Sequence, residues 1–73
     1  MSNFSERLKN LRLEHNLTQE ALGKIIGVKS YSIYTYEKGR SYPDVDALII
    51  LADYFHVSID YLVGRTDKRE VNQ

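Results

Sequence analysis

Side chains that could contact another molecule gather in one stretch of this chain. Four of its six tyrosines fall between Tyr31 and Tyr42, and the cations Lys29, Lys38 and Arg40 lie before or among them. Exposed tyrosine rings add contact area and their hydroxyls add hydrogen bonds, while lysine and arginine attract anions. The stretch therefore indicates a contact surface.

Catalytic chemistry has little support in the sequence. There is no cysteine nucleophile, no cluster of metal ligands and no glycine-rich phosphate loop. The two histidines, His15 and His56, fall at predicted helix ends, where an imidazolium complements the helix dipole. We therefore expect no enzyme, no metal site and no cofactor, and no pocket for a small-molecule effector is evident.

Charge is unevenly distributed along a chain of 73 residues, which has room for one domain. Ten basic residues balance ten acidic ones, and this argues against nucleic acid because its binders usually carry a basic excess. However, residues 1–40 hold seven basic and four acidic side chains, whereas residues 41–64 hold four acidic and no basic ones. A folded domain could thus present one basic face and one acidic face.

No segment of the sequence predicts contact with a membrane. The longest apolar run, Ala47 to Ala52, is far too short to span a bilayer. The N-terminal residues MSNFSERLK lack a basic region followed by an apolar stretch, so no secretory signal is visible. We expect a cytoplasmic protein.

The surface described above must be positioned by helices, because apolar residues recur every three or four positions. Capping residues and glycine stops predict an all-α chain of five helices, at about 3–14, 18–26, 30–38, 44–55 and 58–63. The expected inward faces are Phe4, Leu8 and Leu11; Ala21, Leu22, Ile25 and Ile26; Ile33 and Tyr36; and Val45, Leu48, Ile49, Ala52 and Phe55. We place one domain at 1–64 and a polar tail at 65–73, which we expect to fray or to begin a segment absent here.

Two short helices joined by a tight glycine-containing turn are typical of a helix-turn-helix. The stretch LTQEALGKIIGVKSYSIYTYEKGRSYP, followed by LIILADYFHVSIDYLVG, resembles the lambda-repressor-like (Cro and XRE type) helix-turn-helix family over roughly residues 4–64. The resemblance implies a compact five-helix DNA-binding domain with the motif at helices 2 and 3. It further implies a bacterial or phage-encoded transcriptional regulator, most often a repressor, that binds a pseudo-palindromic operator as a homodimer and is nucleoid-associated when bound.

By this resemblance, the third helix lies in the DNA major groove and its outward residues contact bases. Those positions are Ser30, Tyr31, Tyr34 and Thr35, and helical periodicity independently places them off the face of Ile33 and Tyr36. Because the helix lacks Arg, Gln and Asn, we expect modest direct readout, with DNA shape supplying part of the specificity.

Phosphate contacts are expected from helix starts and from cations. Thr18 and Gln19 resemble the phosphate-clamping pair of the family, and Lys29 stands where the family often has a capping Ser or Thr. The loop after the third helix resembles a backbone-contacting loop. The predicted phosphate contacts are Thr18, Gln19, Lys29, Lys38, Arg40 and Ser41, whereas Lys24 is interpreted as part of a solvated face.

Two further predictions follow from the resemblance. Arg12 and Glu37 match an ion pair between the first and third helices, with a secondary role in presenting Arg12 near the DNA backbone. Family members commonly form dimers through their C-terminal helices, and the candidate interface here is Ile59, Tyr61, Leu62 and Val63. The same residues could instead complete the core.

The acidic segment, residues 41–64, is expected to face away from DNA, because carboxylates close to phosphate would repel it.

A different function on the same fold also fits the sequence. A protein-interaction module, antitoxin-like or coactivator-like, would be compatible with the neutral total charge and with the tyrosine-rich stretch. Salt separates the two hypotheses, because binding through several phosphates weakens steeply as salt rises.

Overall fold

Side-chain caps mark the starts of four of the five helices described here. The computed structural model describes residues 3–70, and within that range it contains five α-helices and no strand. They are α1 (Phe4–Glu14), α2 (Gln19–Ile26), α3 (Ser30–Glu37), α4 (Val45–Phe55) and α5 (Ile59–Leu62). Asn3, Thr18, Asp44 and Ser58 each accept a hydrogen bond from a backbone N–H three residues on. The all-α, five-helix prediction is confirmed.

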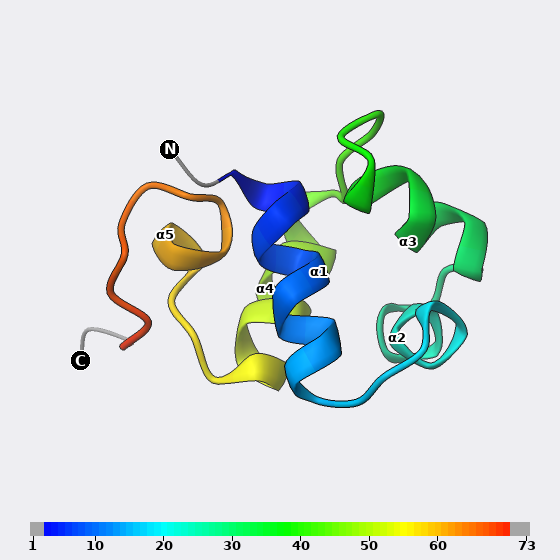
Figure 1. Ribbon diagram of the computed structural model, residues 1–73, viewed down its shortest axis with the longest axis horizontal. Coiled ribbons are helices and arrows are strands. Elements are labelled where there is room, and N and C mark those ends of the chain that lie inside the picture. The colour runs from blue at the N-terminus through cyan, green and yellow to red at the C-terminus, as the bar shows by residue number, and fades with distance from the viewer. Residues whose placement is uncertain (1–2, 71–73) are drawn as a thin grey trace.

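The helices are arranged around α1, which runs through the middle of the view in Figure 1. α2 and α3 pack against each other on one side of α1, and α5 lies on the other side (Figure 1). α4 passes behind α1 in that view and contacts both α2 and α5. None of the helices described here is long and apolar enough to cross a membrane.

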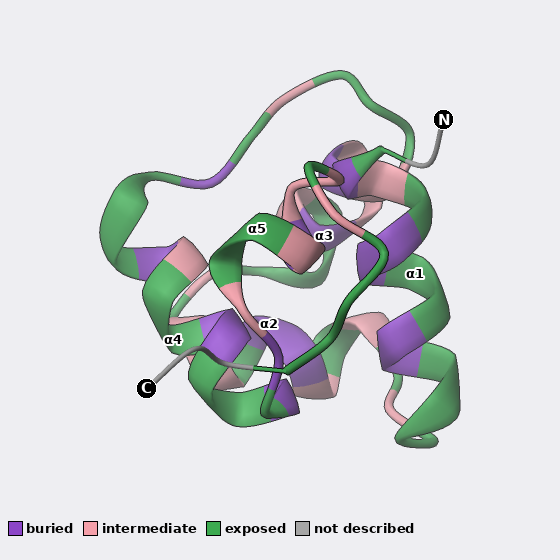
Figure 2. Ribbon diagram, turned by 90° about the vertical axis from the view of Figure 1, so that its left-hand side faces the viewer, coloured by how far each residue is buried: buried purple, intermediate pink, exposed green. Residues whose placement is uncertain are grey.

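A single apolar core joins all five helices. Its fully buried side chains are Leu8, Leu11, Leu22, Ile33, Leu51 and Leu62. Figure 2 shows buried segments alternating with exposed ones along α1 and α4, as expected for helices with one face turned to a shared interior. One face of α2 and one face of α3 therefore pack against the core, and their opposite faces are exposed to solvent.

The predicted inward face of α4 is wrong in part. Val45 is 68% exposed and Ile49 is 42% exposed, whereas Ala47 and Leu51 are buried. Only Asp46 and Asp53 are charged in this helix, so apolar residues lie on nearly every side of it. Such a helix has several possible apolar stripes, and contact with α2 and α5 selects the one that is buried.

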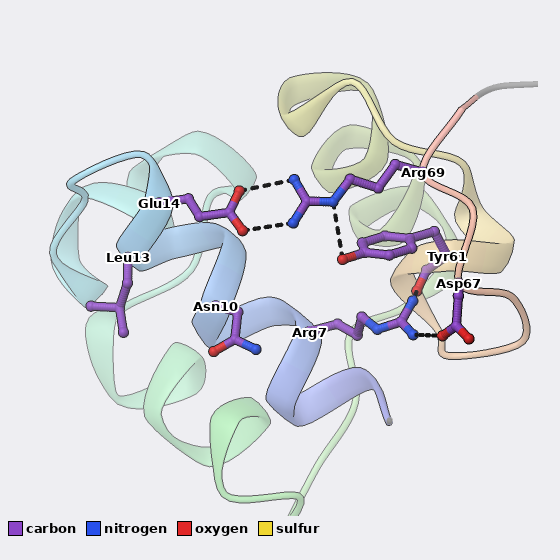
Figure 3. A pocket seen from close by; sticks show the side chains of 7 residues that line it. All are labelled: Arg7, Asn10, Leu13, Glu14, Tyr61, Asp67 and Arg69. Atoms are coloured by element: carbon purple, nitrogen blue, oxygen red, sulfur yellow. Dashed lines mark hydrogen bonds and ion pairs between the residues drawn. The ribbon is translucent and has the colours of Figure 1, made fainter. Parts of the chain in front are cut away.

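The first part of the predicted tail, residues 65–70, contacts the rest of the domain. The guanidinium of Arg7 donates from Nη1 to the carbonyl oxygens of Tyr61 and Thr66, at 2.8 and 2.7 Å. It also donates from Nη2 to Asp67 at 2.7 Å (Figure 3). Arg69 donates two hydrogen bonds to Glu14, at 2.9 and 2.6 Å. Residues 65–70 are thus held against α1 by arginine hydrogen bonds, which apolar periodicity cannot reveal. The rest of the predicted tail, 71–73, lies outside the described residues.

Candidate nucleic-acid interface

The turn between α2 and α3 depends on two glycines. Gly27 ends α2 with φ +77°, a left-handed conformation that costs glycine little. Gly23, one turn earlier, faces the backbone of the turn so closely that a Cβ there would lie 2.5 Å from the Val28 carbonyl oxygen. The Val28 N–H in turn donates to the Gly23 carbonyl oxygen at 2.8 Å. These contacts set how closely α3 follows α2.

Sequence reasoning missed the role of Gly23, although a signal was present. Glycine inside a helix costs about 1 kcal/mol relative to alanine, so its presence in the middle of an eight-residue helix called for an explanation. The explanation is the close approach of the turn, which leaves no room for a side chain.

α3 separates core residues from outward ones as predicted. Ile33 and Tyr36 are buried, and Tyr36 packs edge-on against Phe4 with 6.5 Å between ring centroids. Tyr31 is 68% exposed, and its ring stacks on that of Tyr34 at a centroid distance of 5.9 Å and an interplanar angle of 28°. The outward face of α3 therefore presents a paired aromatic surface.

The structure brings together three of the four predicted base contacts. Ser30, Tyr31 and Tyr34 line a shallow hollow of about 380 Å³ with Gln19, the first residue of α2. Predicted base and phosphate contacts thus share one surface, which spans the beginnings of α2 and α3.

Thr35, the fourth predicted base contact, has its hydroxyl engaged within the protein. Its Oγ1 donates to the carbonyl oxygen of Ser32 at 2.8 Å and lies 2.7 Å from Oγ of Ser41. If Thr35 donates to Ser32, its only hydroxyl hydrogen is used, and Ser41 must donate to Thr35. In this arrangement Ser41 has no hydroxyl hydrogen left for a phosphate.

The remaining predicted phosphate contacts lie at the start of α2 and at both ends of α3. Thr18 caps α2 from an exposed position, and Lys29 occupies the N-cap of α3 without forming a side-chain cap. The ammonium of Lys38 lies 5.7 Å from the Tyr34 ring centroid, and Arg40 is exposed in the loop that follows. Uncapped N–H groups at helix starts favour anions. Cations therefore lie at both ends of α3, the helix that carries the paired tyrosines.

The helix arrangement shows where one acidic residue of segment 41–64 lies. Asp60 belongs to α5, which lies on the side of α1 opposite to α2 and α3 (Figure 1). Asp60 therefore lies across α1 from α3, whose N-cap is Lys29 and whose C-cap is Lys38.

Arg12 and Glu37 form the predicted ion pair. Nε of Arg12 donates to Glu37 at 2.6 Å and Nη2 donates at 3.1 Å, while Nη1 donates to the Leu17 carbonyl oxygen at 2.8 Å. Gln19 adds a hydrogen bond to the same carboxylate at 3.2 Å. Only 11% of the Arg12 side chain and 4% of the Glu37 side chain are exposed. All three guanidinium nitrogens of Arg12 are thus bonded within the protein, and its presentation near the DNA backbone stays a prediction.

The candidate dimer residues have different environments. Leu62 is fully buried in the core, so its prediction as an interface residue is wrong. The Tyr61 ring lies 4.0 Å from the Arg7 guanidinium and 5.2 Å from that of Arg69, and is half-buried within its own subunit. Ile59 is 43% exposed and Val63 is half-buried. An interface in this region would therefore depend on Ile59, Val63 and the exposed part of Tyr61.

Both histidines lie at helix ends. His15 caps the C-terminus of α1, where its Nδ1 is 2.9 Å from the Leu11 carbonyl oxygen and its ring contacts Phe55 edge-on at 4.8 Å. His56 ends α4 with φ +57°. Across residues 3–70, no group of three or more His, Asp or Glu side chains is arranged to hold a metal ion.

The sequence of this chain is similar to those of known transcriptional regulators. The sequence profile of the helix-turn-helix family matches residues 8–62. The transcriptional regulator YobD of Bacillus subtilis is 42% identical over 64 residues, which are 88% of this chain and 57% of that protein. The cryptic phage CTXphi transcriptional repressor RstR of Vibrio cholerae is 39% identical over 69 residues, which are 92% of this chain and 62% of that protein. The chain thus spans little more than half the length of these relatives.

Solved structures show the same fold. The P22 c2 repressor, in complex with a synthetic operator, superposes with a TM-score of 0.83 at 29% identity, covering 90% of this chain and all of that one. A transcriptional regulator from Listeria innocua gives a TM-score of 0.83 at 38% identity, covering 96% of this chain and 64% of that one.

Proposed function

Because this chain belongs to the lambda-repressor-like helix-turn-helix family, we propose that it binds double-stranded DNA and regulates transcription. The observation that carries the proposal is the outward face of α3, on which Tyr31 stacks on Tyr34. Lys29 lies at the N-cap of this helix, Lys38 at its C-cap and exposed Arg40 in the loop that follows. Support also comes from the likeness to the P22 c2 repressor, whose structure holds operator DNA.

In this proposal, α3 enters the major groove and its outward residues face the base edges. Ser30, Tyr31 and Tyr34 contact bases, and Thr35 contributes through its methyl group. Phosphates are bound by N–H groups at the starts of α2 and α3, with Thr18, Gln19, Lys29, Lys38 and Arg40 around them. Ser41 joins them only if its bond to Thr35 opens.

We further propose that the protein is a repressor that acts as a homodimer on a pseudo-palindromic operator. A single domain with no net charge gains little nonspecific attraction from DNA, so a second subunit would supply much of the affinity. The two copies of α3 would then lie about 34 Å apart in successive major grooves. Ile59, which is exposed, and the half-buried Tyr61 and Val63 are the proposed contacts between subunits.

Selection of bound sequences from a pool of random duplexes tests this function. We expect recovery of one sequence with approximate two-fold symmetry, and a footprint that protects both half-sites. Recovery of a single asymmetric half-site would refute the homodimer while leaving DNA binding intact. Recovery of no preferred sequence would refute the regulator and favour a protein-interaction module, to which the exposed Tyr31 and Tyr42 would then belong.

A further inference from the structure

A hollow with aromatic walls lies at the centre of the proposed interface. It is bounded by Gln19, Ser30, Tyr31 and Tyr34, has a volume of about 380 Å³, and is open to solvent. Two of its four residues present phenol rings that stack on each other, one turn apart on α3. We name this site the tyrosine hollow.

The tyrosine hollow combines an apolar wall with a polar edge. Tyr31 is mostly exposed, so its ring face is unprotected by the core. Gln19 uses one N–H for its bond to Glu37, which leaves its carbonyl oxygen and second N–H available. Ser30 adds a hydroxyl at the first position of α3. A ligand that fits must therefore bring a small apolar group next to hydrogen-bonding atoms.

The four residues that line the tyrosine hollow carry no charge that could bind a charged group. The nearby Lys38 ammonium lies 5.7 Å from the Tyr34 ring and does not line the hollow. Phosphate is thus expected around the tyrosine hollow, and a neutral apolar group within it.

We propose that the tyrosine hollow receives the 5-methyl group of a thymine, an inference that rests on the proposed entry of α3 into the major groove. Thymine is the one ordinary base that presents a methyl group there, beside its O4 acceptor. The methyl group packs against the stacked rings of Tyr31 and Tyr34, and the hydroxyl of Ser30 donates to O4. Because α3 lacks Arg, Gln and Asn, this contact is the main direct base readout of the domain.

Removing the methyl group gives a direct test. Each thymine of the selected site is replaced singly by deoxyuridine, which keeps every hydrogen-bonding atom and removes only the methyl group. Burial of one methyl group favours binding by about fourfold. We therefore expect at least one thymine in each half-site at which the replacement weakens binding by about that factor, with little effect elsewhere.

Two variants assign the effect to the tyrosine hollow. Tyr31→Ala should bind thymine and uracil duplexes equally at that position, because the apolar wall is gone. Tyr31→Phe keeps the ring and should retain the discrimination. Helical circular dichroism checks that both variants are folded.

The outcomes separate this inference from the proposed function. Equal binding of thymine and uracil at every position, or a selected site without thymine, would overturn the tyrosine hollow as a methyl-binding site while sequence-specific binding stands. Persistence of the discrimination in Tyr31→Ala would overturn it in the same way. Failure to select any sequence would remove both proposals together.

Discussion

The guanidinium of Arg12 meets the carboxylate of Glu37 through two hydrogen bonds, from Nε at 2.6 Å and from Nη2 at 3.1 Å. The pair joins α1 to the last residue of α3, and both side chains are almost entirely shielded from water. Gln19, at the start of α2, donates to the same carboxylate. One buried carboxylate thereby fixes the relative positions of the three helices that form the proposed interface.

Replacing Arg12 alone should lower the free energy of unfolding more than replacing both Arg12 and Glu37. Arg12→Met leaves the Glu37 carboxylate buried without its cation, and we expect the free energy of unfolding to fall by roughly 3–5 kcal/mol. The double variant Arg12→Met/Glu37→Met buries no charge and should recover at least half of that loss. Urea denaturation followed by circular dichroism measures both. Equal losses in the single and double variants would show that the stranded charge is not the cause.

Gly23 should tolerate a branched side chain poorly. Gly23→Val forces atoms into the backbone of the turn at Val28, and we expect a loss of about 2–3 kcal/mol in the free energy of unfolding. Lys24→Val is the matched control, since it places the same side chain on the next, exposed residue of α2 and should cost only about 0.5 kcal/mol. Thermal denaturation compares the two variants. Similar melting temperatures would mean that the turn can shift to make room.

Lys29 should affect DNA affinity without affecting sequence preference. Removal of one phosphate contact by Lys29→Ala is expected to weaken binding to all duplexes by a similar factor and to reduce the log–log salt slope by about 1. Lys24→Ala removes the same charge from the α2 surface and should leave the slope unchanged. A change in sequence preference in Lys29→Ala would indicate that α3 is rotated in the groove relative to the proposal.

The ion pair between Arg69 and Glu14 should weaken as pH falls. Hydrogen bonds from Arg69 hold the pKa of Glu14 below its ordinary value, so the folded state binds a proton less readily than the unfolded state. The stabilisation is therefore complete above the ordinary glutamate pKa of about 4.3 and is lost as pH falls through the lower folded value.

Glu14→Gln measures the size of this effect. The pair is half exposed, so the variant should lose at most about 1 kcal/mol at pH 7. Its stability should converge with that of the unaltered protein in acid, as measured by urea denaturation from pH 7 to pH 2. A difference that stays constant across this range would contradict an ionic contribution from Glu14.

Helix boundaries were predictable because their signals are local. Asn3, Thr18, Asp44 and Ser58 are good N-caps, and each bonds a backbone N–H only three residues away. Gly27 marks the end of α2 through its own backbone conformation. Short-range chemistry of this kind can be read in a window of a few residues.

Features that depend on distant contacts were not predictable in the same way. Arg7 and Thr66 are 59 positions apart, and their hydrogen bond leaves no periodic pattern. Leu62 and Ile59 are both apolar residues of α5, and only the folded structure shows that one is core and the other surface. The bond between Thr35 and Ser41 likewise needs the loop after α3 to fold back.

The salt dependence of duplex binding tests the central claim most directly. The selected duplex and a scrambled duplex of the same length are titrated with protein from 50 to 200 mM salt. We predict tighter binding of the selected duplex, and an affinity that falls with a log–log slope of about −0.9 for each phosphate neutralised, summed over several phosphates. An affinity that does not change with salt, or equal affinity for the two duplexes, would contradict sequence-specific DNA binding by this domain.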